Sequence, residues 1–216
     1  SDNTKNDSDG TGFLVHKCYQ AKQTGFIQPY ADSPMDHEQV GEEVYISMAN
    51  KAEKYCWFMT PYLIITDEMS HALCLAAKRG VDVRIITPGI PDKKMIYNIT
   101  RSFYHGLVKH GVRIYEWTPG FCHAKMSVAD DCMATCGTIN LDYRSLYHHF
   151  ENGCFMADCQ AVLDIRNDLA ATMDECREVD RTVQYRTQRV FAPGTAVYEI
   201  ICGIIITLLF TPFTVT

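Results

Sequence analysis

The spacing of hydrophobic and polar positions changes along the chain, and each spacing predicts an element. From residue 40 to residue 52, apolar residues recur on one helical face. The apolar run YCWFM that follows is typical of a strand, and Pro61 ends it. We therefore expect a helix followed directly by a buried strand.

The next segments alternate between helix and strand. Thr66 can cap a helix over DEMSHALCLAAKR, and Gly80 can end it in the left-handed conformation. VDVRIIT is typical of a buried strand, residues 94–110 of a helix that stops at Gly111, and VRIYEW of a third strand. This order predicts a parallel α/β sheet.

The last third has a different pattern. HAKMSV and CMATC are expected to be strands joined by a turn at Asp130 and Asp131, which makes a hairpin. NGCFMA is expected to be another strand, and a long helix over residues 161–179 closes the domain. The fold class is therefore α/β, with a mixed, mainly parallel β-sheet flanked by helices.

The length of the chain and its polar and apolar segments divide it into three expected parts. Its 216 residues suit one well-buried domain, which we place at 25–190. Residues 1–24 are expected to be a flexible leader with a first strand near 12–18, followed by loop through Gln28-Pro29 and Ser33-Pro34. Residues 191–216 form an apolar C-terminal tail, whose run from 200 to 213 is shorter than the roughly 20 residues of a membrane span. This run can be a core helix, an interfacial anchor or a docking surface.

The start of the sequence and its composition narrow the class of protein. The polar opening SDNTKNDSDGTG lacks a starting Met and a secretory signal, so we expect a piece of a longer chain. The net charge of −6 argues weakly against a nucleic-acid partner. The ten cysteines lie largely in apolar segments without a C-x-x-C pair, so we expect free thiols, no metal and no other cofactor.

One short segment concentrates the candidate chemistry at the spacing H-x-K-x4-D-x6-G-x2-N. His123 and Lys125 are two residues apart, so on a strand they share a face. A neutral imidazole can attack phosphorus, while the Lys125 ammonium and the Asn140 amide donate to the non-bridging oxygens. Gly137 is expected to let backbone amides approach those oxygens.

Two carboxylates are further candidates. Glu151 is expected to hold one ring nitrogen of His123 so that the other can attack. Asp130 lies at the hairpin turn, where it can be structural or catalytic. The remaining histidines lack such neighbours and are expected to be surface or packing residues.

These residues resemble the HKD motif of the phospholipase D superfamily. QPYADSP, LCLAAKRGVDVRIITP and GTINLDYRSLYHHFENG are similar to the C-terminal half of bacterial cardiolipin synthases, from about Gly25 to Asp158. The residue after Gly137 is commonly Ser in the family, and Thr138 keeps the hydroxyl. The resemblance implies substrate-binding roles for Gly137 and Thr138.

The resemblance also implies an activity: a phosphatidyltransferase that makes cardiolipin from phosphatidylglycerol through a phosphohistidine, at the cytoplasmic face of the cell membrane. Its partners are then a phospholipid substrate and the membrane surface, without nucleic acid. Such enzymes carry two motifs, of which one histidine takes the phosphatidyl group and the other protonates the departing alcohol.

This sequence contains one motif. We expect an N-terminal half with a second HKD motif as partner, and the alternative is two copies of this chain facing each other. Two other functions stay open: a single-motif homodimeric phosphodiesterase or nuclease, and a non-catalytic membrane-binding domain.

Overall fold

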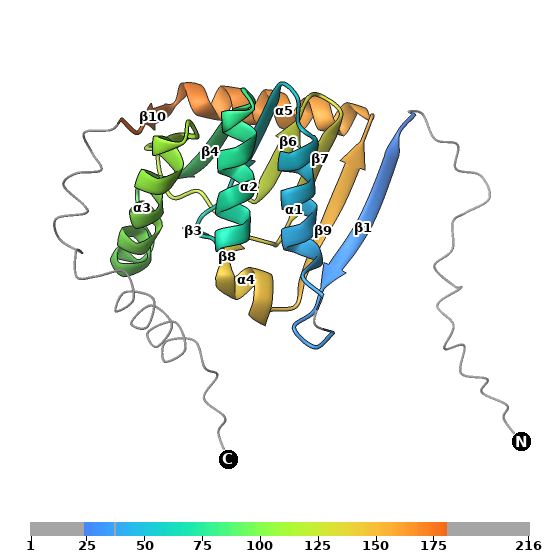
Figure 1. The fold of residues 1–216 in the computed structure, drawn as a ribbon, viewed down its shortest axis with the longest axis horizontal. Coiled ribbons are helices and arrows are strands. Elements are labelled where there is room, and N and C mark those ends of the chain that lie inside the picture. Colours follow the sequence, from blue (N-terminus) through green and yellow to red (C-terminus); the bar gives the residue numbers. More distant parts are fainter. Residues whose placement is uncertain (1–23, 37, 181–216) are drawn as a thin grey trace, which may run out of the picture.

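The computed structural model describes residues 24–36 and 38–180. The predicted strand near 12–18 and the apolar tail at 191–216 lie outside the described residues. Within them, one sheet has the strand order β1-β9-β7-β6-β2-β4-β5-β10 (Figure 1). Its strands are β1 (Phe26–Asp32), β2 (Tyr55–Met59), β4 (Asp82–Pro88), β5 (Arg113–Trp117), β6 (Met126–Ala129), β7 (Met133–Gly137), β9 (Glu151–Ala157) and β10 (Cys176–Glu178).

The sheet is mixed, as the sequence predicts, but it is not mainly parallel. In this sheet only the pairs β2–β4 and β4–β5 are parallel, and the flanking pairs β2–β6 and β5–β10 are antiparallel. The hairpin β6–β7 and the strands β9 and β1 extend the sheet on one side. The α/β fold class is thus confirmed, whereas the share of parallel pairing was overestimated, because helical crossovers join only these three strands.

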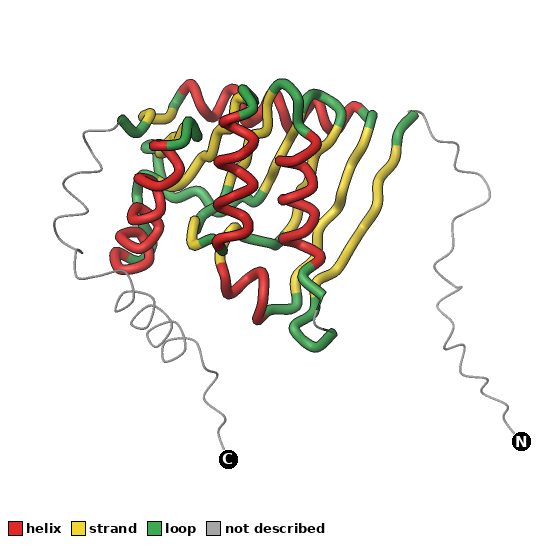
Figure 2. Tube along the Cα trace, in the orientation of Figure 1, coloured by secondary structure: helices red, strands yellow, loops and turns green. Residues whose placement is uncertain are grey.

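Helices cover both faces of the sheet (Figures 1 and 2). The helices α1 (Val40–Lys51), α2 (Asp67–Lys78) and α3 (Lys94–Lys109) lie on one face, and α5 (Gln160–Asp174) lies on the other. Alternate strand residues therefore enter two cores: Phe58 and Ile85 pack towards the first three helices, and Met59 and Ile86 pack towards α5.

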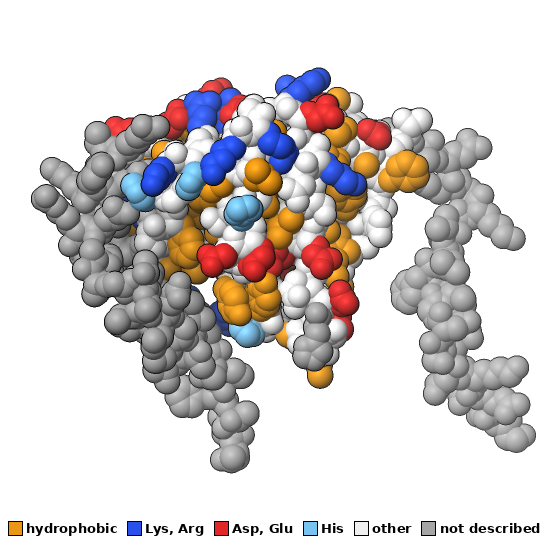
Figure 3. Space-filling view, in the orientation of Figure 1, with side chains coloured by type: hydrophobic (Ala, Val, Ile, Leu, Met, Phe, Trp, Pro, Cys, Tyr) orange, Lys and Arg blue, Asp and Glu red, His pale blue; other side chains and the backbone are white. Residues whose placement is uncertain are grey.

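Several local predictions are confirmed. The Thr66 hydroxyl accepts a hydrogen bond from the backbone N–H of Met69 at 3.1 Å, which caps α2. Gly80 and Gly111 follow their helices with φ of +94° and +101°. Acidic residues fill the first turns of α1 and α2, where they face the positive helix ends. Figure 3 shows acidic side chains in a row across this face.

Two of the local predictions were wrong. Gln28 and Pro29 lie in β1, where an edge strand tolerates proline because one side of it needs no N–H donor. The last helix ends at Asp174, and β10 replaces the predicted final turn. The segment after β7 forms β8 (Leu141–Asp142), which pairs with β3 (Leu63–Ile64), and then the short helix α4 (Tyr143–His148).

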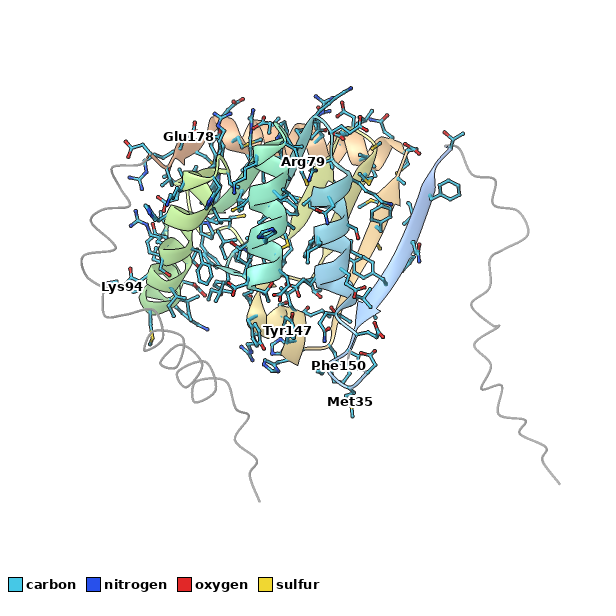
Figure 4. All side chains as sticks on the ribbon, viewed as in Figure 1. Met35, Arg79, Lys94, Tyr147, Phe150 and Glu178 are labelled. Atoms are coloured by element: carbon cyan, nitrogen blue, oxygen red, sulfur yellow. The ribbon has the colours of Figure 1, made fainter. Side chains whose placement is uncertain are left out.

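One end of the molecule is built from α4 and the loops beside it. Figure 4 shows Met35, Tyr147 and Phe150 at this end, and Arg79 and Glu178 at the opposite end. Among the described residues, no helix has the length and apolar character needed to cross a membrane.

Candidate functional site

The predicted histidine and lysine meet beside the first residue of β6. They lie in the segment that leads into the strand rather than on it, because β6 begins at Met126. The Lys125 Nζ is 2.8 Å from His123 Nδ1 and donates to the His123 carbonyl oxygen at 2.7 Å. The contact between imidazole and ammonium therefore exists in the ligand-free fold.

Two adjoining hollows open at this pair. One has a volume of about 500 Å³ and the other about 270 Å³, and both are lined by His123 and Asn140. The larger is also lined by Lys125, Gly137, Thr138 and Glu151. The smaller is lined by aromatic, aliphatic and cationic side chains that include Tyr62, Ile64, Lys93, Ile96, Tyr143 and Arg144. The structure thus brings together all the predicted site residues except Asp130.

The surroundings of the His123 imidazole favour its neutral form. Partial burial lowers its pKa, and the Lys125 cation lowers it further, against a smaller opposing effect of Asp92. Tyr62, which donates to Asp92 at 2.7 Å, has its ring 6.1 Å from the His123 ring. A neutral ring has an unprotonated nitrogen, as nucleophilic attack requires.

The pKa of Lys125 is also lowered on balance. Burial lowers its pKa, while Glu151, Asp142 and Cys122 raise it. Burial outweighs the effect of these neighbours, so the site disfavours the charged form of Lys125. Such a cation can stabilise negative charge on phosphate oxygens.

Asn140 is fixed by buried hydroxyl groups on both sides of it. Tyr45 donates to the Ile139 carbonyl at 2.8 Å, and the Thr60 hydroxyl accepts from the Leu141 N–H at 3.0 Å. The Asn140 side-chain amide donates to Asp142, while its Oδ1 is buried without a hydrogen-bond partner among the described residues. Hydrogen bonds thus hold the loop on both sides of Asn140, a residue that lines both hollows.

Asp130 follows the last residue of β6, whereas Lys125 precedes its first residue. The four residues of the strand separate them by about 13 Å, at about 3.3 Å per residue. Its carboxylate accepts from the backbone N–H groups of Glu53, Lys54 and Tyr55 at 2.7, 2.9 and 2.8 Å. Partial burial by itself raises the pKa of Asp130, but these hydrogen bonds outweigh it and leave the pKa below its usual value. The structure thus assigns Asp130 to the fold and not to the site.

The expected phosphate cradle of backbone amides is not formed by Gly137 and Thr138. Their N–H groups donate to Lys125 and Asn152 carbonyl oxygens, at 3.3 and 2.8 Å. A Cβ on Gly137 would lie 2.4 Å from the Asn152 oxygen and 2.6 Å from the Gly153 Cα. The glycine therefore serves the close approach of β7 and β9.

The predicted hydrogen bond between Glu151 and His123 is absent from the structure. The Glu151 Oε1 instead accepts from the Ser145 hydroxyl at 2.6 Å and lies 3.6 Å from His149 Nδ1. Sequence reasoning missed Ser145 and Asp142, which follow the motif in LDYRS. The polar residues directly after the motif are the feature of the sequence that could have identified them.

No group of three or more His, Cys, Asp or Glu side chains suited to a metal ion occurs in the described part of the chain. The eight described cysteines are free thiols.

Comparison with known proteins shows the family of this chain. The family model "Cardiolipin synthase, PLD-like domain" matches residues 45–173. A Streptococcus mutans protein named only as uncharacterized is 49% identical over 83% of this chain and 39% of its own length. Cardiolipin synthase 2 of Bacillus anthracis is 33% identical over 85% of this chain and 36% of its own length. The chain thus spans between a third and two fifths of the length of these relatives.

A solved structure shows the same fold. Nuc of Salmonella typhimurium, a phospholipase D family member, superposes with a TM-score of 0.60 at 16% identity. The match covers 72% of this chain and 99% of Nuc.

Proposed function

This chain belongs to the family of phospholipase D-like cardiolipin synthase domains, and we propose that it supplies one catalytic half of a phosphatidyltransferase that makes cardiolipin from phosphatidylglycerol. The observation that carries the proposal is the contact of the His123 imidazole with the Lys125 ammonium at the edge of a hollow. The relative named cardiolipin synthase 2 supports the choice of product.

In the proposed reaction, an unprotonated ring nitrogen of His123 attacks the phosphorus of one phosphatidylglycerol. The P–O bond to the headgroup glycerol breaks, and a second imidazole protonates the departing oxygen. The free hydroxyl of a second phosphatidylglycerol then attacks the phosphohistidine and gives its proton to that second imidazole. The P–N bond breaks, so the products are cardiolipin and glycerol and both imidazoles return to their starting state.

Lys125 stabilises the charge on the non-bridging phosphate oxygens in this scheme. Loss of a single such contact costs about 3 kcal/mol of transition-state stabilisation. Asn140 lies beside both hollows and offers a further polar contact to the headgroup. Gly137, Thr138 and Glu151 shape the larger hollow around the phosphate.

We propose that the second imidazole comes from outside the described residues. In-line displacement needs the nucleophile and the proton donor on opposite sides of phosphorus, and His123 and Lys125 lie on the same side. We propose that an N-terminal half with a second HKD motif supplies it, because the chain spans only part of its relatives. We place the reaction at the cytoplasmic face of the cell membrane, on a domain over residues 25–190.

The test is product analysis with the full-length protein. Vesicles of isotope-labelled phosphatidylglycerol should yield labelled cardiolipin and one glycerol per cardiolipin, and His123→Ala should abolish both products. Phosphatidic acid as the main product would show that water is the acceptor. Phosphodiester hydrolysis by a homodimer of this chain, without cardiolipin, would favour the single-motif phosphodiesterase instead.

A further inference from the structure

The rim of the smaller hollow exposes apolar side chains to solvent. The hollow lies between the start of α3 and α4, because Lys93, Ile96, Tyr143 and Arg144 all line it. Met95, which lies between two of these lining positions in the sequence, is 47% exposed, and Tyr143 is 43% exposed. The opening is therefore bordered by side chains that an apolar partner can cover.

The same two segments place cations beside the exposed apolar side chains. Lys93 and Lys94 directly precede Met95, and both are exposed. Arg144 directly follows Tyr143 and lines the hollow. A surface that combines apolar or aromatic side chains with Lys and Arg is typical of proteins that lie on anionic lipid, because the apolar groups enter the interface and the cations attract the headgroups.

The carboxylates of these two segments, residues 90–96 and 142–146, are fewer than the cations. Asp92 accepts from the Tyr62 hydroxyl at 2.7 Å and from the Lys93 backbone N–H at 2.7 Å. Asp142 is buried and accepts from the Ser145 backbone N–H at 2.9 Å. The two segments thus carry a net positive charge, and it complements the negative charge of phosphatidylglycerol.

We propose that this rim, formed by residues 90–96 and 143–144, docks on an anionic lipid bilayer, so that the smaller hollow opens onto the membrane surface. A lipid can then keep its acyl chains in the bilayer while its headgroup enters the hollow that His123 also lines. The larger hollow stays available for the second imidazole. The inference rests on the proposed function, because it takes a lipid as the substrate.

Leu75 on α2 provides an internal control for this proposal. It is 44% exposed, close to the value for Met95, and Lys78 lies three residues further on the same helix face. Leu75 lines neither hollow, and Figure 4 shows Arg79, at the end of α2, on the side of the molecule opposite α4. Exposure and a neighbouring cation are thus shared, and only the position relative to the site differs.

Photolabelling from within the bilayer tests the docking without using activity. The full-length protein would be reconstituted in phosphatidylglycerol vesicles that contain a trace of phosphatidylcholine with a diazirine in one acyl chain. Phosphatidylcholine is the probe because it is not the proposed substrate, so its adducts report contact with the bilayer. After illumination and digestion, mass spectrometry should find adducts on the peptides that contain Met95 and Tyr143 several-fold more often than on the peptide that contains Leu75.

A matched pair of variants tests the role of charge. Lys94→Gln should lower the labelling of the Met95 peptide by about fivefold in phosphatidylglycerol vesicles, because one cation near an anionic bilayer contributes about this factor. The same variant should have no effect on labelling in phosphatidylcholine vesicles. Lys78→Gln, the same change beside Leu75, should leave the labelling of the Met95 peptide unchanged in both kinds of vesicle.

Equal labelling of the Met95 and Leu75 peptides would overturn the proposal. So would the absence of adducts at the rim, which is the result expected if the N-terminal half covers this surface instead. The outcome is separable from the proposed function. Cardiolipin formation without adducts at the rim would defeat the docking alone, and adducts at the rim of a protein that makes no cardiolipin would defeat the proposed product alone.

Discussion

The two ends of the β6–β7 hairpin carry the same motif but use it in opposite ways. At the turn, the Asp130 carboxylate is satisfied by three backbone N–H groups of the segment entering β2. At the open end, His123 and Lys125 bond mainly to each other, and the Asn140 Oδ1 has no partner in the described residues. One end completes its hydrogen bonds within the fold, and the other leaves polar groups for a ligand.

The pKa shifts also differ between the two ends of the hairpin. The pKa of Asp130 lies below its usual value, so the fold favours the charged form. The pKa values of His123 and Lys125 are both lowered, so their charged forms are disfavoured. Polar groups held in a disfavoured state are typical of functional sites, since a bound substrate can relieve them. We therefore propose that this single sequence motif contains both a structural and a reactive part.

The largest contrast is expected between activity and stability in His123→Ala. We expect turnover of phosphatidylglycerol to fall by at least about 10³-fold, because the nucleophile is lost. The free energy of unfolding should change by less than about 0.5 kcal/mol, since the side chain is exposed. Cardiolipin assays of the full-length variant, paired with urea unfolding, measure both. A large loss of stability would remove the contrast between the two ends.

Lys125→Ala tests the electrostatic effect of the lysine at the open end of the hairpin. Turnover should fall by about 10² to 10³-fold, because one contact to the phosphate oxygens is lost. The His123 pKa should rise, since the neighbouring cation that lowers it is gone. An NMR titration of the histidine ring checks this shift, with Lys54→Ala as a control near the turn. An unchanged or lower His123 pKa would contradict the electrostatic account.

Asp130→Ala should reduce stability and leave turnover nearly unchanged, which is the opposite of the effect expected for His123→Ala. Three backbone N–H groups lose a charged acceptor, so we expect a loss of about 2 to 4 kcal/mol in the free energy of unfolding. Turnover per folded molecule should stay within a few-fold of the wild type. Urea unfolding and cardiolipin assays at low temperature, where the variant is folded, separate the two quantities. A folded Asp130→Ala protein without activity would show that Asp130 belongs to the site.

The smallest expected effect is the dependence of this stability on pH. Because the folded pKa of Asp130 is lowered, its contribution is present above the unfolded pKa of about 3.9 and is lost as the pH falls through the folded value. Asp130→Asn should therefore be less stable than the wild type by about 1 kcal/mol at neutral pH. Unfolding curves should show a constant gap from pH 7 to about pH 4 and a narrowing gap as the pH falls further, and a gap that does not narrow would rule out the ionised carboxylate as its source.

Features set by neighbouring residues were predictable from the sequence, while those set by distant residues were not. Thr66, Gly80 and the Asp130–Asp131 turn follow local rules, and the two aspartates have the positive φ values of 51° and 59° that such a turn requires. The strand β1 was missed because its proline is tolerated only at an edge, which depends on the whole sheet.

Within the site, the contacts of Glu151 and Gly137 were likewise not predictable from the sequence. The sequence placed both residues near the motif correctly, but their contacts depend on how β9 and α4 pack beside β7. Ser145 reaches Glu151 because a six-residue helix turns the chain back over the site. Gly137 is required by the Asn152 carbonyl of a neighbouring strand rather than by a phosphate.

The central claim is that His123 itself takes the phosphatidyl group, and trapping the intermediate tests it most directly. The full-length protein would be mixed with phosphatidylglycerol, quenched within milliseconds in alkaline denaturant and digested, and its peptides analysed by mass spectrometry. We predict a phosphatidyl adduct on the peptide that contains His123, and its absence in His123→Ala. An adduct on a histidine outside this chain's motif, with His123 unmodified throughout turnover, would contradict the claim.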